Sequence, residues 1–273
     1  MSNENPPITL FLRLFTLFEV VVLVVAGVGV FFLADVTRPI WPWDIPPFNA
    51  AFIGAIYLAS VPAIGMLALI GRWAPARLVL AMLLTFTGIG LVASVLNLGD
   101  FQFQRWTAWF WFFLYISLPI NSVIHLWLYR RRPPAQPISI PAAWRYYLLV
   151  QGFVLILYGV GQFVVPLALS SFWPWKIDAF HGQLYSGAFV ATAVGGVLIS
   201  RWAARLEFLA QGLSQIRFGL FAVGGLVLVD ATAHRVNWSA LGTWAWIGGF
   251  TVLTGAGLGM LWHWRTMQWA AAK

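Results

Sequence analysis

Eight separate runs of apolar residues, each long enough to cross a membrane, constrain this chain more than any other feature of its sequence. A membrane-spanning helix needs about 20 predominantly apolar residues. The segments between the runs are short and polar or proline-rich, so none of them can form a soluble domain. The predicted spans are 8–33, 48–70, 78–98, 106–129, 143–170, 179–200, 206–232 and 240–264.

The composition agrees with this pattern, because 61% of the 273 residues are hydrophobic and only 9% are charged, whereas a soluble domain carries about 25% charged residues. There is no cysteine, which excludes disulfides and thiolate metal sites. The first run follows a polar stub and lacks a small-residue cleavage site, so we expect no cleavable signal peptide. The expected fold class is an all-α membrane protein with eight transmembrane helices.

Basic residues gather at one end of the predicted spans. That end carries Arg13, Arg72, Arg77, Arg130, Arg131, Arg132, Arg145, Arg201, Arg205, Arg265 and Lys273. The other end carries only Arg38, Arg105, Lys176 and Arg235. Cytoplasmic loops are enriched in Lys and Arg, so we expect both termini in the cytoplasm. The net charge of +8 is thereby explained by topology, and the expected partners are membrane lipids rather than nucleic acid.

The sequence Trp-Pro-Trp occurs twice, at 41–43 and 173–175, and identities around it continue at the same offset of 132 residues. In the fourth span of each half the offset becomes 135. The matched pairs include Arg13 and Arg145, Leu17 and Leu149, Val22 and Val154, Phe31 and Phe163, Phe48 and Phe180, Trp111 and Trp246, and Trp127 and Trp262. This pattern predicts a duplicated protein.

The predicted organisation is a four-helix repeat at 1–132, a basic, proline-rich cytoplasmic linker at 133–141 and a second four-helix repeat at 142–273. Four spans are an even number, so both repeats insert with the same orientation. Two parallel repeats are related by a pseudo-two-fold axis along the membrane normal.

The four tryptophans of the repeated motif are Trp41, Trp43, Trp173 and Trp175. Tryptophan favours the membrane–water interface, where its ring is half buried and its N–H stays wet. We therefore predict that these side chains are interfacial anchors of a tight outer turn. The alternative is a ligand that stacks on the paired rings.

The pattern W-P-W-x-I-x-x-F, followed by a span rich in small residues and an Arg-Trp pair, resembles a set of uncharacterised bacterial polytopic membrane proteins with a W-P-W loop motif. The resemblance covers the motif and the following span in each half. It implies a location in the bacterial plasma (inner) membrane, and it implies no activity.

Ionisable residues inside spans are costly and usually face the protein interior or water. Glu19 and Arg217 are the two charges that lie well inside predicted spans and away from their ends, and they have opposite signs. We predict that both point toward the seam between the halves, where they pair directly or share a polar cavity with Gln151 and Gln215. The pair would be a structural tie or a site for substrate or protons, and separate snorkelling to the headgroups is the remaining alternative. Asn121 is a further polar candidate, with an interhelical hydrogen bond as its alternative role.

His125 and Met260 occupy matching positions at an offset of 135, and a His–Met pair can ligate haem. The simpler interpretation is a histidine that contacts helix-end carbonyl groups. The sequence contains no catalytic motif and no metal-ligand cluster, so we expect no enzyme activity and no metal site. A retinal Schiff base is excluded, because no lysine lies in a span.

The sequence favours a protein that binds or translocates a small molecule at the repeat interface. One alternative is a non-catalytic accessory or structural subunit of a larger membrane complex, or of a homo-oligomer. A second alternative is a redox subunit that binds haem, chlorin or quinone, although no cofactor is strongly implied.

Overall fold

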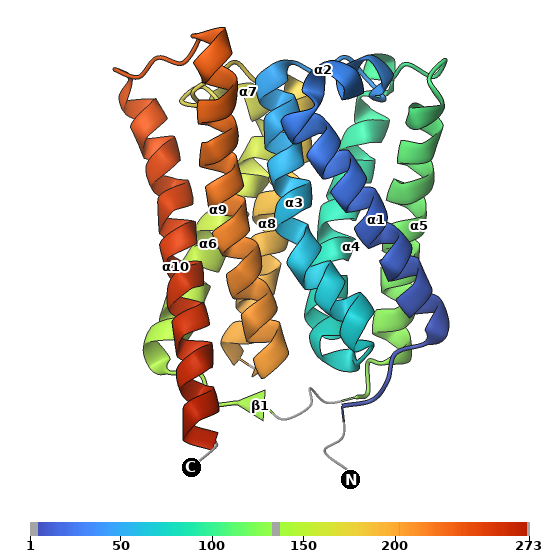
Figure 1. Cartoon of the computed structure of the whole chain (residues 1–273), viewed down its shortest axis with the longest axis vertical. Coiled ribbons are helices and arrows are strands. Elements are labelled where there is room, and N and C mark those ends of the chain that lie inside the picture. The colour runs from blue at the N-terminus through green and yellow to red at the C-terminus, as the bar shows by residue number, and fades with distance from the viewer. Residues whose placement is uncertain (1–4, 133–136, 202, 272–273) are drawn as a thin grey trace.

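The computed structural model describes residues 5–132, 137–201 and 203–271, and for 137 and 267–271 it describes the backbone only. Eight long helices run side by side along the long axis of the molecule (Figure 1). Each of them is long and apolar enough to cross a membrane. They are α1 (Leu10–Phe32), α3 (Pro47–Ile70), α4 (Trp73–Leu96), α5 (Trp106–Leu128), α6 (Ala142–Val164), α8 (Ala179–Arg201), α9 (Arg205–Ala233) and α10 (Leu241–Ala271).

Short elements close the two ends of the bundle. At the end opposite the termini lie α2 (Ala34–Thr37), η1 (Arg38–Ile40), η2 (Leu98–Asp100) and α7 (Pro166–Leu169). At the end that carries the termini, β1 (Pro137–Ile138) pairs antiparallel with β2 (Ala203–Ala204). Part of the predicted linker, at 133–136, lies outside the described residues.

Three helix ends differ most from the predicted spans: α10 continues to Ala271 instead of residue 264, α6 ends early, and α4 begins early. Prolines lie at the last two of these places. The residue before a proline is pushed out of the helical region. Val165, before Pro166, has φ −128° and ψ 61° and ends α6 well before the predicted residue 170. Ala74, before Pro75, has φ −97° and ψ 109°, so a kink divides the first residues of α4 from the rest of the helix, and α4 begins at Trp73 instead of the predicted residue 78.

The two halves of the chain interleave instead of forming two separate bundles. Within each half, the first helix packs along the second, as α1 on α3 and α6 on α8, and the third packs along the fourth, as α4 on α5 and α9 on α10. Between the halves, α3 packs extensively along α9, and α8 along α4, whereas α3 and α4 touch each other much less. The second and third helices of both halves therefore form the centre of the molecule.

Glycines at matching positions allow the first and second helices to approach closely, as small residues do in membrane bundles. A Cβ atom on Gly27 would lie 3.1 Å from the Leu58 side chain, and one on Gly159 would lie 2.6 Å from Val190. A larger residue at either position would force its neighbours on the second helix to shift, and the shift would be larger at Gly159 than at Gly27.

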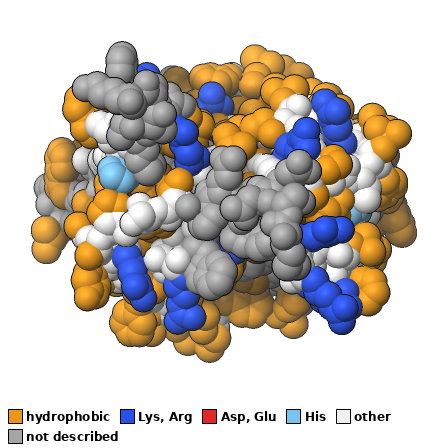
Figure 2. All heavy atoms as spheres, turned by 90° about the horizontal axis from the view of Figure 1, so that it is seen from below, with side chains coloured by type: hydrophobic (Ala, Val, Ile, Leu, Met, Phe, Trp, Pro, Cys, Tyr) orange, Lys and Arg blue, Asp and Glu red, His pale blue; other side chains and the backbone are white. Residues whose placement is uncertain are grey.

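The end of the bundle that carries the termini is basic. Figure 2 views this end and shows Lys and Arg side chains spread over it, with no acidic side chain visible among the residues drawn in colour. Lys273 lies outside the described residues.

Candidate functional site

A cavity of about 740 Å³ lies between α1, α3, α4 and α5. Its volume falls within the roughly 300–1,000 Å³ of small-molecule sites. Most of its lining is aliphatic or aromatic, and on the outer side it includes the exposed valines Val21, Val25 and Val28 of α1. The cavity therefore opens sideways between α1 and α5, on the surface that a membrane would cover.

Contacts of α5 with the start of α1 and with η1 bound this lateral opening at its two ends. Near the basic end, the Thr9 hydroxyl at the start of α1 and His125 Nε2 are 2.8 Å apart. Farther from the basic end, the rings of Phe18 and Phe110 approach each other edge to face, and Phe110 belongs to the cavity lining. At the opposite end, the Thr107 hydroxyl donates a 2.5 Å hydrogen bond to the carbonyl oxygen of Ile40. Apart from these contacts α1 and α5 hardly touch each other, which leaves a window between the two helices.

Glu19 on α1 is the one charged residue that lines this cavity. It is 4% exposed, and within the described part of the chain its carboxyl group has no hydrogen bond and no ion pair. Tyr57 on α3 and Tyr115 on α5 line the same cavity, and their two hydroxyl groups are neighbours. The cavity thus combines an apolar wall with one unpaired carboxyl group.

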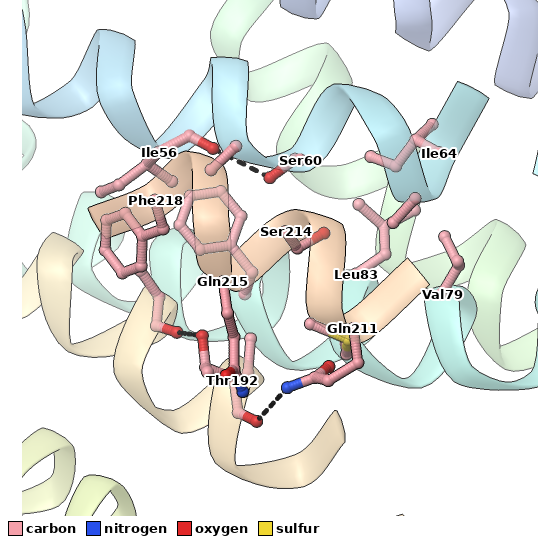
Figure 3. A pocket seen from close by; sticks show the side chains of 16 residues that line it. Ile56, Ser60, Ile64, Val79, Leu83, Thr192, Gln211, Ser214, Gln215 and Phe218 are labelled. Carbon is pink, nitrogen blue, oxygen red and sulfur yellow. Dashed lines mark hydrogen bonds between the residues drawn. The ribbon is translucent and has the colours of Figure 1, made fainter. Parts of the chain in front are cut away.

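A smaller pocket of about 80 Å³ lies at the centre of the molecule, where α3, α4, α8 and α9 meet (Figure 3). Three side chains of α9 contribute buried oxygens that have no hydrogen-bond partner among the described residues, namely Gln211, Ser214 and Gln215. The other end of each glutamine is bound: Gln211 donates to the carbonyl of Thr192, and Gln215 donates to Gln151 at 3.0 Å. A cavity of only about 10–15 Å³ can hold one water molecule. This central pocket, called the seam pocket below, is therefore large and polar enough to hold water.

The lateral cavity and the seam pocket adjoin each other. Ser60 and Ile64 of α3 and Leu83 and Phe86 of α4 line both of them. The polar groups of the seam are therefore separated from Glu19 only by this shared wall.

The structure brings together two of the predicted interior residues, Gln151 and Gln215, and separates the predicted ion pair. Glu19 is buried, but Arg217 lies on the exposed face of α9 and joins none of the ion pairs of the described residues. The prediction that Arg217 points to the seam is wrong, because each helical residue turns by about 100°. Arg217 is therefore about 200° from the inward-facing Gln215.

The structure also separates the predicted haem ligands. His125 lies on α5 and Met260 on α10, at opposite sides of the bundle (Figure 1). Both ring nitrogens of His125 are engaged, Nε2 with Thr9 and Nδ1 with the carbonyl of Asn121. Asn121 itself is buried on α5 and lines neither of the two cavities. The proposed His–Met ligation is therefore wrong.

Three of the four Trp-Pro-Trp tryptophans are buried inside the protein and Trp175 is partly buried, which corrects the prediction that they are half-buried lipid anchors. Trp43 is 1% exposed, while Trp41 and Trp173 are each 7% exposed. Trp43 donates to His181 Nε2 at 3.1 Å, and Trp175 donates to the side-chain oxygen of Asn49 at 2.7 Å. The motif thus joins the halves to each other.

His181 is hydrogen-bonded on one side to Trp43 and on the other side to Asp178. Because an indole N–H only donates, His181 Nε2 must accept, and the ring proton lies on Nδ1, 2.7 Å from Asp178 Oδ2. Asp178 also accepts from the backbone N–H of His181 and caps α8. Burial raises the pKa of Asp178, but these hydrogen bonds outweigh burial and hold that pKa below its ordinary value of 3.8.

An ion pair that the sequence analysis overlooked joins α4 and α9 near the basic end. The guanidinium of Arg77 donates two hydrogen bonds to Glu207, at 2.9 and 2.8 Å, and Glu207 is fully buried. Glu207 also accepts the backbone N–H of Ala204. Glu207 was the available signal, because it is an acidic residue within a predicted span, two residues after Arg205.

We found no match for this chain among protein-family models, curated proteins or solved structures. Among the described residues, no three His, Asp or Glu side chains gather in a way that could hold a metal ion. Eight apolar helices make this chain a multi-pass helical membrane protein.

Proposed function

We propose that this protein binds a small, largely apolar molecule, which enters the lateral cavity from the membrane. The observation that carries the proposal is the cavity of about 740 Å³ with its opening between α1 and α5 and a single carboxyl group, Glu19, on its wall. Ligand sites are typically apolar cavities with a few polar groups that orient the ligand.

A hydrophobic photolabel tests this proposal. An apolar aryl diazirine, applied to the purified protein in lipid nanodiscs, should label residues of the cavity wall saturably, as mapped by mass spectrometry. Val22→Trp should abolish this labelling, because Val22 lines the cavity. The matched control is Val154→Trp, since residue 154 lies 132 positions later and its side chain is exposed. Non-saturable labelling that is equal in both variants would refute the proposal.

We also propose that the chain is a duplication with a pseudo-two-fold axis along the membrane normal. If each of the first four long helices is exchanged for its counterpart among the last four, the α3–α9 contact becomes the α8–α4 contact. The list of neighbouring helices is unchanged by this exchange. The Trp-Pro-Trp contacts support the same relation: Trp43 bonds to His181 and Trp175 to Asn49, and adding 132 to 43 and 49 gives 175 and 181. Such reciprocal contacts are the mark of a two-fold interface.

Ring contacts repeat this reciprocity. Trp43 packs on Phe180 at 4.9 Å between ring centroids, and Trp175 packs on Phe48 at 5.6 Å. A cryo-EM map tests the relation directly, because the helices should superpose after a half-turn about the membrane normal. A half-turn about an axis in the membrane plane would refute it.

The expected location is the bacterial inner membrane with both termini in the cytoplasm. The basic end of the bundle that holds the termini supports this orientation (Figure 2). Cysteines at Asp44 and Asp178 should react with an impermeant reagent on intact cells, whereas a cysteine at Pro134 should not. Labelling at Pro134 would invert the topology.

The second candidate function, an accessory subunit of a larger complex, is favoured by the exposed Arg217. This residue lies 12 positions after Arg205, the first residue of α9, which corresponds to about 18 Å along the helix. A cation at that depth is costly unless it finds a partner. If a partner helix supplies a carboxylate, Arg217→Leu should dissociate the complex in native mass spectrometry of the mildly solubilised membrane. An unchanged complex would leave this candidate without support.

A further inference from the structure

The chemistry of the lateral cavity narrows the class of ligand. Its wall is apolar except for a few side chains. Leaving aside those at the end of the bundle, they are Glu19, Tyr57, Ser60, Thr87 and Tyr115. The hydroxyl groups of Ser60 and Thr87 are already bonded to backbone carbonyls four residues earlier. The main group left for a ligand is therefore the carboxyl of Glu19.

The unpaired carboxyl calls for a positive partner. An isolated charge buried in apolar surroundings is strongly destabilising, so a buried carboxylate is normally paired. Within the described part of the chain no Lys, Arg or His lines this cavity. The nearest expected partner, Arg217, faces outward instead. The counter-charge must then come from the ligand or from a proton.

The aromatic lining favours a cation as well. The wall contains five tryptophan and tyrosine side chains, which lie on α3, on α5 and in the turn after η1, namely Trp41, Tyr57, Trp106, Trp111 and Tyr115. The faces of such rings attract organic cations, and aromatic cages are a recurrent recognition site for quaternary ammonium groups. A molecule that fits this cavity thus combines large apolar groups with one positive charge.

We propose that the ligand is a lipophilic organic cation, which enters between α1 and α5 and pairs with Glu19. This inference rests on the proposed binding function and specifies its ligand. Glu19 holds either a proton or the cation, so the two compete for one carboxyl group. Apart from Glu19 on α1, the titratable groups that face the cavity are Tyr57 on α3 and Tyr115 on α5, and α4 contributes only the uncharged Thr87 and apolar side chains.

Three probes of similar shape and different charge test the proposal. Tetraphenylphosphonium is the cation, tetraphenylborate the matched anion, and triphenylphosphine oxide the neutral analogue. Binding is measured by equilibrium dialysis against the full chain in nanodiscs, with empty nanodiscs as blank. The cation should bind saturably at one site per chain, its affinity should fall as the pH is lowered, and the anion should show no saturable binding.

Glu19→Gln should weaken binding of the cation by about tenfold or more, because a buried charge pair is lost, and should leave binding of the neutral analogue unchanged. Asp44→Asn is the matched control, since it removes an acidic group whose side chain is 84% exposed. This variant should bind the cation as the parent does.

The failures of the two proposals are distinguishable. Equal, saturable binding of the cation and the neutral analogue that is insensitive to Glu19→Gln would overturn the cation assignment and keep the cavity as a binding site. If no probe binds saturably and the diazirine labelling is also non-saturable, both proposals fall. Competition of the neutral analogue with the diazirine label, without binding of the cation, would overturn the cation assignment alone.

Discussion

The two halves of the chain are alike at the end of the bundle opposite the termini, which is called the outer end below, and they differ in the interior of the bundle. At the outer end, one tryptophan of each Trp-Pro-Trp motif donates a hydrogen bond to the other half of the chain. Trp43 donates to His181, and Trp175 donates to Asn49. Inside, the offsets of 132 and 135 match Glu19 with Gln151, Tyr57 with Phe189, and Tyr115 with Phe250.

The difference separates two roles that a duplicated protein can divide between its halves. The first half keeps an unpaired carboxyl group and two phenols around the lateral cavity. In the second half, Gln151 is hydrogen-bonded to Gln215, and phenylalanine replaces both tyrosines. The shared outer contacts hold the halves together, whereas the interior of the first half is available for a ligand.

The largest expected effect breaks the junction of the halves near the basic end. Arg77→Ala leaves the fully buried Glu207 without its cation, which should lower the free energy of unfolding by about 3–5 kcal/mol. The double variant Arg77→Ala with Glu207→Leu should lose far less. Thermal unfolding in detergent measures both, and equal losses in the single and double variants would show that the ion pair does not join α4 and α9.

The next largest effect is a loss of stability that tests whether the Trp-Pro-Trp contacts of the two halves are equivalent. Trp43→Phe and Trp175→Phe each remove an N–H donor and leave a buried acceptor unpaired, at a cost of about 1–3 kcal/mol each. Similar losses in the two variants, measured by the same unfolding assay, would support the pseudo-two-fold relation. A large loss in one variant alone would argue against it.

A smaller effect, an increase in stability instead of a loss, tests the difference between the interiors of the two halves. Tyr115→Phe gives the first half the residue of the second half and removes a buried hydroxyl that has the Tyr57 hydroxyl as its neighbour but makes no hydrogen bond of normal geometry within the described residues. We expect this variant to be more stable than the parent by about 1 kcal/mol. Tyr185→Phe is the control, because the Tyr185 hydroxyl donates to the carbonyl of Asn49 and its loss should destabilise. Destabilisation by both substitutions would indicate a partner for Tyr115.

The smallest effect concerns the starts of α3 and α8. The first half begins α3 after Pro46, and the second half has the capping Asp178 at the matching position. Because the pKa of Asp178 is lowered in the folded protein, its charge stabilises the fold above pH 3.8, and this contribution disappears as the pH falls through the folded-state pKa.

Asp178→Asn keeps a capping side chain and removes the charge. The Asp178 side chain is 54% exposed, so the loss at neutral pH should stay below about 1 kcal/mol. Parent and variant should converge in unfolding temperature at acidic pH, and a difference that persists there would exclude the charge as its cause.

The sequence predicted the spans well because apolar length is a local property. The predicted and observed bounds of the first span differ by only a few residues, 8–33 against Leu10–Phe32. Which side of a helix faces inward depends on neighbouring helices, so Gln215 was placed correctly and Arg217 was not. Glu207 was missed because an acidic residue near a span end reads as a loop charge until its partner on α4 is known. The tryptophans were misplaced because a membrane interface and a protein core both favour their rings.

The interleaving of the helices has a consequence for how the protein is made. Spans enter a membrane in the order of synthesis, and α3 emerges long before α9, with which it packs along its length. Until the last spans are inserted, the first four must wait in the bilayer with the seam faces of α3 and α4 covered only by lipid. Biogenesis therefore cannot end with one finished half beside another, and a ribosome that stalls in the linker would leave a product that the membrane's quality-control proteases can recognise.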